Sequence, residues 1–257
     1  MILKVLGSVS PFSHKEKNCP GYLITTDSKL LLDCGNGITR YMNFPKDLEN
    51  LTIIISHLHK DHYGDLFSIA YASYVYHNLG LLSKRIKVYI PKQTSLDELY
   101  DFELLTNLGV EHYLEINTYT EEDVIDIKST QITFSKNPHS IPSYSTKISY
   151  DNKNIVYSGD TGYLGNTLEK FAAGTNLLIC ESTFLKGQKR NKDYHLYAHE
   201  AALIASSSKA KKLLLTHFWP EIDKEKYLAE ALPIFNNSDV AEENKVLRIN
   251  WFYVIIT

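Results

Sequence analysis

The chain has 257 residues, of which 44% are hydrophobic and 22% charged, as is ordinary for a globular protein that buries a sizeable core. Its formal charge of −3, from 27 Lys and Arg against 30 Asp and Glu, gives no general attraction to nucleic acid or membranes. We therefore expect no stable nucleic-acid partner and no membrane association, although a local basic patch stays open.

The first half of the chain predicts strands interrupted by two helices. Short apolar runs bounded by turn residues indicate strands at 2–6, 21–25, 29–33 and 52–55. Helical spacing of apolar residues then indicates a helix at 65–80, followed by a strand at 86–90, a helix at 95–108 and a strand at 112–117.

The second half opens with four predicted strands, at 123–128, 131–135, 145–150 and 154–158. After them we expect a short helix at 166–173, a strand at 176–181, a helix at 198–208, a strand at 211–216, a helix at 223–234 and a final strand at 246–256. Meandering strands followed by mixed strand and helix occur twice, which suggests two packed sheets with helices outside. Because no repeat or Pro/Gly-rich linker interrupts the chain, we expect a single domain over 1–257.

The cysteines and the N-terminus bear on the compartment. Cys19, Cys34 and Cys180 are odd in number and widely spaced, which argues against a disulfide framework and against a cysteine-built zinc site. The apolar start at 1–7 is too short for a signal peptide, and no apolar run approaches the ~20 residues of a membrane span. We expect a cytoplasmic protein.

Residues 57–62 carry the strongest chemical signal in the sequence. They read His-Leu-His-Lys-Asp-His and follow the apolar strand at 52–55, so that His57, His59, Asp61 and His62 gather at its end. Crowded imidazoles would lack hydrogen-bond partners without a metal ion, and neutral histidine suits zinc-like ions well. The block predicts a metal site.

Three further candidates each come just after a predicted strand, and they are His139, Asp160 and His217. Taken singly, each is an ordinary loop or turn residue. Side chains at strand ends share one edge of a sheet and have rigid support. Their joint occurrence after the histidine block therefore favours one metal centre built from distant loops.

This series of residues resembles the metallo-β-lactamase superfamily, whose His-x-His-x-Asp-His signature stands here at 57–62. The likeness begins with LGS at 6–8 and LLLDCG at 30–35, and it continues through SGDT at 158–161 to LTH at 215–217. It implies an α/β fold, a four-layer αβ/βα sandwich with metals at one edge.

The resemblance also implies how the ligands divide between two metal ions. The first ion would be bound by His57, His59 and His139, and the second by Asp61, His62 and His217, with Asp160 bridging both. Asp33 matches a family position that orients the site without binding metal.

Within the superfamily, two segments resemble the ribonuclease Z-like, phosphodiesterase-like branch: LLICESTF at 177–184 and HLYAHEAA at 195–202. By that match His195 contacts the scissile phosphate. His199 falls inside the helix that follows, where we expect it on a helix face, and Cys180, which replaces a frequent His, is expected to be a small buried side chain because its neighbours are apolar. Tyr197 replaces the usual Thr of the branch. The long Gly/Pro-rich arm with which ribonuclease Z grips tRNA has no counterpart in the sequence, so we expect a smaller substrate.

The implied site holds two divalent cations, with zinc preferred and manganese or iron also suited to the His/Asp set. Two such ions share a water whose pKa falls toward ~7, so that a metal-bridging hydroxide is available at neutral pH. Asp61 would aim that nucleophile or take its proton, and His195 would bind a phosphoryl oxygen or protonate the leaving group. The expected activity is a phosphodiesterase acting on a cyclic nucleotide or another nucleic-acid-related phosphodiester.

Other functions stay open on the sequence. The same metals can serve a thioester or lactone hydrolase, and a metal-binding sensor without catalysis is a third alternative. Substrate contacts from the basic loop at 186–192, or from the helix with Tyr71, Tyr74 and Tyr76, are also open. Related proteins suggest a homodimer by analogy only.

Overall fold

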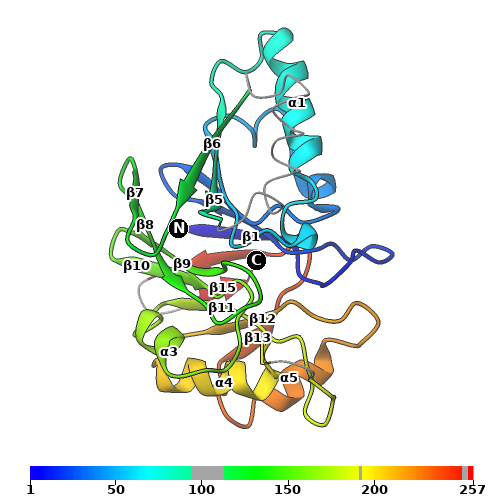
Figure 1. Ribbon diagram of the computed structural model, residues 1–257, viewed down its shortest axis with the longest axis vertical. Helices are drawn as coiled ribbons and strands as arrows, with labels where there is room; N and C mark the ends of the chain where they lie inside the picture. The colour runs from blue at the N-terminus through cyan, green and yellow to red at the C-terminus, as the bar shows by residue number, and fades with distance from the viewer. Residues whose placement is uncertain (94–112, 191–192, 251–253, 257) are drawn as a thin grey trace.

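The computed structural model describes residues 1–93, 113–190, 193–250 and 254–256 (Figure 1). Within these residues the strands form two sheets, which lie side by side in the middle of the molecule. Helix α1 (Leu66–Asn78) lies at one end, and α3 (Thr167–Phe171), α4 (Ala198–Ser207) and α5 (Glu225–Ala231) lie at the other. The layers therefore run helix, sheet, sheet, helix, as the sequence predicts.

The first sheet has the strand order β15-β14-β1-β2-β3-β4-β5-β6 over the described residues. Its strands are β1 (Ile2–Gly7), β2 (Gly21–Thr25), β3 (Lys29–Leu32), β4 (Leu51–Ile54), β5 (Ile86–Pro91), β6 (Leu114–Tyr119), β14 (Val246–Ile249) and β15 (Val254–Ile256). From β3 to β6 the strands pair in parallel, so their carboxyl ends meet at one edge.

The second sheet has the order β13-β12-β11-β10-β9-β8-β7 in the same part of the chain. Its strands are β7 (Val124–Ile127), β8 (Thr130–Lys136), β9 (Tyr144–Tyr150), β10 (Lys153–Tyr157), β11 (Leu177–Glu181), β12 (Leu213–Thr216) and β13 (Ser238–Val240). Strands β10 to β13 are parallel, and β8 runs in the same direction because it and β10 are both antiparallel to β9.

Continuous apolar runs form the central strands because both faces of these strands are buried. In β3, Leu30 and Leu32 join the core between the sheets, whereas Leu31 joins the core beneath α1. Helix α1 buries Leu66, Ile69, Ala70 and Ser73, which share one face at the spacing of an amphipathic helix. The buried face of α4 consists largely of alanines, which let the helix lie close to the second sheet.

Within the described residues, the predicted elements agree with the structure except near the C-terminus. The single strand expected at 246–256 is wrong: β14 and β15 are two strands that pair antiparallel, so the chain reverses between them. Strand β13 was not predicted, because its three residues Ser-Asp-Val are too few for an alternating apolar pattern. The helix predicted at 95–108 lies outside the described residues.

Cys19, Cys34 and Cys180 are all buried and form no disulfide. No helix within the described ranges combines the length and apolar character that a membrane crossing requires.

Candidate metal centre

Loops that follow strands bring the predicted ligands to one edge of the sandwich. Residues 57–62 follow β4 and include a 3₁₀ helix, Lys60–His62. The other ligand candidates follow strands of the second sheet: His139 after β8, Asp160 after β10 and His217 after β12. Because these strands point the same way, residues far apart in sequence meet at their carboxyl ends.

The first group of possible ligands consists of His57, His59, His139 and Asp160, whose ligand atoms all lie within 4.8 Å of one another. His59 Nδ1 lies 3.0 Å from His57 Nε2 and 3.2 Å from His139 Nε2. Asp160 Oδ2 lies 3.5 Å from His57 Nε2. The sequence-predicted ligands of the first ion are thus together in space.

The second group consists of Asp61, His62 and His217, also within 4.8 Å of one another. The Nε2 atoms of His62 and His217 are 3.3 Å apart, and Asp61 Oδ2 lies 3.6 Å from the former and 3.8 Å from the latter. Asp160 Oδ1 approaches the same two nitrogens at 3.3 and 3.0 Å. Asp160 therefore turns one carboxylate oxygen to each group.

The donor set fits divalent cations. Pairs of imidazole nitrogens face each other at 3.0–3.3 Å, and a neutral imidazole carries only one N–H for its two nitrogens. Asp160 Oδ1 is buried and makes no hydrogen bond of acceptable geometry. An orphaned carboxylate oxygen among converging nitrogen lone pairs is costly in a protein interior, and a bound cation removes that cost.

Burial lowers the pKa values of two histidines in the first group, which favours the neutral form. It lowers the pKa of His57 well below its ordinary value, with His62 adding to the effect, and burial together with His139 lowers the pKa of His59 to about 4. Both side chains are then neutral at pH 7, which is the form that binds a metal.

Carboxylates dominate around His62. Burial would lower the pKa of this imidazole, but the negative charges of Asp160, Asp61 and Asp33 outweigh it and hold the pKa well above the ordinary value. The second group is therefore a place where accumulated negative charge favours a cation.

Each of four ligand histidines has its other ring nitrogen occupied. His62 Nδ1 lies 2.6 Å from Asp33 Oδ2, and His217 Nδ1 lies 2.8 Å from Thr183 Oγ1. His57 Nδ1 lies 3.1 Å from Ser56 Oγ, and His139 Nδ1 lies 3.1 Å from the Tyr194 carbonyl oxygen. Such contacts fix the ring orientation, so that Nε2 of each histidine is directed into the site.

Asp33, which contacts His62 on the side away from the site, makes several further hydrogen bonds and is fully buried. Its Oδ1 accepts a 2.6 Å hydrogen bond from the Ser56 backbone N–H, and its Oδ2 accepts bonds from Ser56 Oγ at 2.8 Å and Tyr157 OH at 2.7 Å. It contacts His62 and is outside both ligand groups, which is the position that the family resemblance implies.

The backbone at the site adopts conformations that most residues avoid. Asp33 and His217 have positive φ angles of 55° and 65°. Gly159, with φ 58°, precedes Asp160, and a Cβ atom there would come within 3.0 Å of Ser56 Cβ and of the Tyr144 carbonyl oxygen. Any larger residue would therefore be strained and crowded at the turn that directs Asp160 between the two groups.

His195 lies beside the ligands, paired with a residue that the sequence analysis missed. Its Nδ1 lies 3.0 Å from Oε1 of the buried Glu181, and its ring stacks on that of His217 with centroids 5.4 Å apart. Burial alone would lower the pKa of His195, but Glu181 outweighs burial and raises the pKa to about 9. The signal for Glu181 was available: it is an acid that ends an apolar strand, as at the other site positions.

Glu181 is held firmly by its neighbours. Its Oε1 accepts the Thr161 N–H at 3.0 Å, and its Oε2 accepts the Leu196 N–H at 3.1 Å and the Thr183 hydroxyl at 2.7 Å. Although His195 could join a third ligand group with Asp160 and His217, its Nδ1 is engaged with Glu181. His195 thus lies beside the first two groups of possible ligands, with one ring nitrogen held by Glu181.

The remaining residues of that segment have packing roles. Tyr197 OH donates to the Gln188 carbonyl oxygen at 2.8 Å, and His199 lies on α4, 3.8 Å from a Glu230 carboxylate oxygen. Arg190, in the basic loop, binds Glu200 at 2.8 Å and lies over the Tyr197 ring. This arginine is thus engaged in holding the loop against α4.

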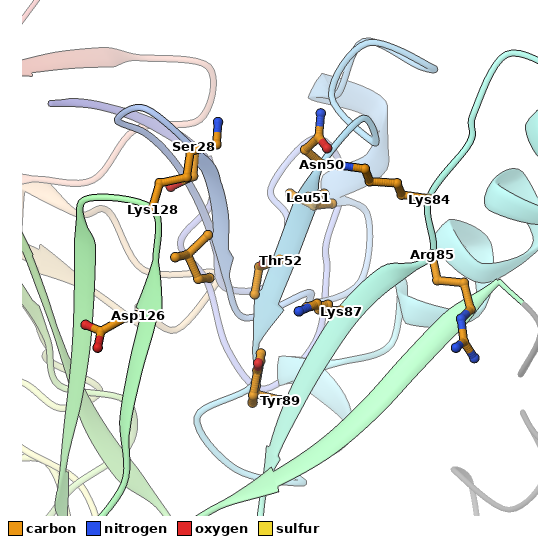
Figure 2. A pocket seen from close by; sticks show the side chains of 11 residues that line it. Ser28, Asn50, Leu51, Thr52, Lys84, Arg85, Lys87, Tyr89, Asp126 and Lys128 are labelled. Carbon is orange, nitrogen blue, oxygen red and sulfur yellow. The ribbon is translucent and has the colours of Figure 1, made fainter.

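A cavity of about 320 Å³ lies at the opposite end of the strands (Figure 2). Its lining includes Leu51 at the start of β4, whereas the histidine block follows the end of that strand. Lys87 points into it and Lys84 and Lys128 flank it (Figure 2). Because it contains no member of the ligand groups, this cavity is distinct from the metal centre.

A family model described as a beta-lactamase superfamily domain matches residues 28–218. The probable metallo-hydrolase YhfI of Bacillus subtilis (strain 168) is 27% identical over 219 residues, which cover 84% of this chain and 86% of that protein. The ribonuclease Z of Clostridium acetobutylicum is 25% identical over 304 residues, which cover 96% of this chain and 97% of that protein.

Solved structures show the same fold. The crystal structure of YhfI from B. subtilis has a TM-score of 0.83 at 24% identity and covers 96% of this chain and 99% of that one. The short form of human tRNase Z has a TM-score of 0.77 at 21% identity and covers 97% and 100% of the two chains. The four-layer fold expected from the sequence is confirmed.

Proposed function

The chain belongs to the β-lactamase superfamily and is a metal-dependent hydrolase, and from that premise we propose that it hydrolyses phosphodiester bonds with two divalent cations. The main observation that supports two metal ions is the position of Asp160 between the two ligand groups. Its Oδ1 faces His62 and His217, and its Oδ2 faces His57. A single carboxylate between two sets of imidazoles is suited to bridging a pair of ions.

Two divalent cations held by these residues would polarise a phosphoryl oxygen and supply a nucleophilic water at neutral pH. The proposed ligands are five imidazoles and the carboxylates of Asp61 and Asp160, which offset only part of the metal charge. A phosphodiester monoanion is complementary to the remaining positive charge. We propose zinc as the metal, with manganese or iron as alternatives that the same donors suit.

Asp61 is proposed to align the attacking water and accept its proton. Its Oδ2 accepts a 2.9 Å hydrogen bond from Ser10 Oγ, which fixes the carboxylate beside His62 and His217. A carboxylate held in one orientation at the second ligand group meets the geometric requirement for a general base.

His195 is proposed to act on the phosphate and the leaving group. With Nδ1 held by Glu181, its Nε2 is left to donate to a phosphoryl oxygen or to protonate the departing alkoxide. A thioester expels a thiolate, which needs little protonation, whereas a phosphodiester expels a basic alkoxide, so such a donor favours the phosphodiesterase over a thioester hydrolase.

The likeness to ribonuclease Z supports a substrate related to nucleic acid. The net charge of −3 and the absence of a tRNA-gripping arm in the sequence favour a small one, such as a cyclic nucleotide or a short nucleic-acid end.

The test combines metal analysis with a substrate panel. Protein loaded with zinc, manganese or iron is offered bis(p-nitrophenyl) phosphate, 2′,3′- and 3′,5′-cyclic nucleotides, a thioester and a lactone. We expect two ions per chain and turnover of diesters. Turnover of the thioester or lactone alone would replace the phosphodiesterase proposal, and bound metal with no turnover of any ester would favour a sensor.

A further inference from the structure

Two large aromatic side chains are exposed side by side on the surface. Phe12 is 44% and Trp219 37% exposed, and their rings meet edge to face with centroids 5.9 Å apart. A contiguous exposed apolar surface can mark a place where a ligand or partner binds.

The loops that carry these rings are joined by backbone hydrogen bonds. The Ser10 N–H donates to the Phe218 carbonyl oxygen at 2.9 Å, and the Phe218 N–H donates to the Ser8 carbonyl oxygen at 3.0 Å. Lys17 Nζ adds a 2.5 Å bond to the Pro220 carbonyl oxygen. The loop after β1 and the loop after β12 project from the same side of the molecule (Figure 1). The aromatic pair therefore rests on a fixed support.

The same loops supply residues of the metal centre. Ser10, two residues before Phe12, donates to Asp61, and His217, two residues before Trp219, belongs to the second ligand group. Each ring is thus carried two residues from a side chain of the second ligand group or its hydrogen-bond partner.

The tryptophan is held from two directions. Its backbone N–H donates to the hydroxyl of the buried Tyr227 at 3.2 Å, and its Nε1 donates to Glu221 Oε2 at 3.3 Å. Since the indole N–H is engaged at one edge, the exposed part of the ring offers mainly its π surface. A fixed π surface loses little entropy when it stacks on another ring.

We propose that Phe12 and Trp219 form an aromatic platform for the base of a nucleoside esterified to the phosphate that is cleaved, with one ring stacked on the base and the other, nearly perpendicular ring against its edge. This inference rests on the proposed phosphodiesterase function and names the substrate class as nucleoside phosphodiesters. Aromatic side chains stack on any base, so the platform recognises a nucleoside without selecting its base.

Two diesters with the same leaving group test the proposal: thymidine 5′-(p-nitrophenyl phosphate) and methyl p-nitrophenyl phosphate. Alanine in place of Trp219 or Phe12 should raise the KM for the thymidine ester about ten- to one-hundred-fold, the range expected for one lost stacking contact. The kcat/KM for the methyl ester should stay within about twofold of the wild-type value, and Trp219→Phe should keep most of the thymidine preference. The control variant is Tyr71→Ala, which removes a 65% exposed ring from α1.

The proposal would be overturned if the alanine variants lost kcat/KM equally on both esters, or if they lost none on the thymidine ester. Calorimetric binding of thymidine 5′-monophosphate to metal-loaded protein separates this proposal from the proposed reaction. Suppose that wild-type protein turns over neither ester but binds the nucleotide, and that the Phe12→Ala variant does not bind it. That result would support the platform and contradict the proposed phosphodiesterase activity. Metal content measured on each variant shows whether the Trp219 change disturbs His217.

Discussion

Glu181 Oε1 lies 3.0 Å from His195 Nδ1, and it joins the end of an apolar strand to the residue that we propose contacts the phosphate. The carboxylate is buried and accepts bonds from two backbone N–H groups, so it holds the imidazole in one orientation. A positioned histidine of this kind contributes through proton transfer or hydrogen bonding in the transition state.

Replacing Glu181 by Gln should therefore lower kcat for a diester by roughly a hundredfold, because positioned acid–base groups contribute 10²–10⁴-fold. Both metal ions should remain, since Glu181 is outside the first two ligand groups. Steady-state kinetics and metal analysis on the same sample measure the two effects. Loss of metal in Glu181→Gln or in His195→Ala would mean that the pair supports the ligands and not the substrate.

Replacing Asp61 by Ala should reduce the metal content from two ions to one and remove most of the turnover. The variant deletes one member of the second ligand group and leaves His57, His59, His139 and Asp160 unchanged. Elemental analysis after dialysis measures the stoichiometry. Two tightly held ions in Asp61→Ala would refute its assignment as a ligand. Lys87→Gln, which changes the distant cavity, is the matched control and should retain both ions.

Replacing Asp33 by Asn should weaken binding of the second metal ion about 10- to 100-fold, as is typical when the partner of a ligand histidine is lost. Asp33 Oδ2 lies 2.6 Å from His62 Nδ1 and fixes the orientation of that ring. The asparagine side chain is neutral and so lacks the negative charge that strengthens this contact. Competition with a chromogenic chelator measures the affinity. Tyr157→Phe removes one bond to Asp33 and keeps the carboxylate, so its effect should be smaller. A larger loss in Tyr157→Phe than in Asp33→Asn would contradict this role.

Removing the metal should lower the melting temperature, because the site gathers carboxylates and imidazoles that only a cation can satisfy together. Metal at a concentration one thousand times its dissociation constant raises the free energy of unfolding by roughly 4 kcal/mol. For a chain of this size, that gain corresponds to a rise in melting temperature of about 10 °C. Calorimetry with chelator, and again after zinc is restored, measures the shift. An unchanged melting temperature in protein shown to have lost its metal would argue against a site of this kind.

Local patterns were enough to predict most of the fold. Apolar runs such as 30–32 and 53–55 are buried on both faces whichever strands flank them, so they predict strands without further information. The error at 246–256 arose because apolar and aromatic residues continue in the sequence from β14 to β15, so the pattern shows no break between the two strands. The strand β13 is short and polar, and it depends on its neighbour β12 for pairing.

The sequence by itself determined which side chains are the candidate metal ligands, because His57, His59, Asp61 and His62 are gathered by local connectivity and the other candidates repeat at strand ends. Only the tertiary structure decided which groups act as pairs. Glu181 meets His195, and Phe12 meets Trp219, through parallel strands and bonded loops that join distant parts of the chain. The sequence shows the chemical groups that each side chain carries. A contact between distant residues forms only when the two sheets pack and their strand ends share one edge.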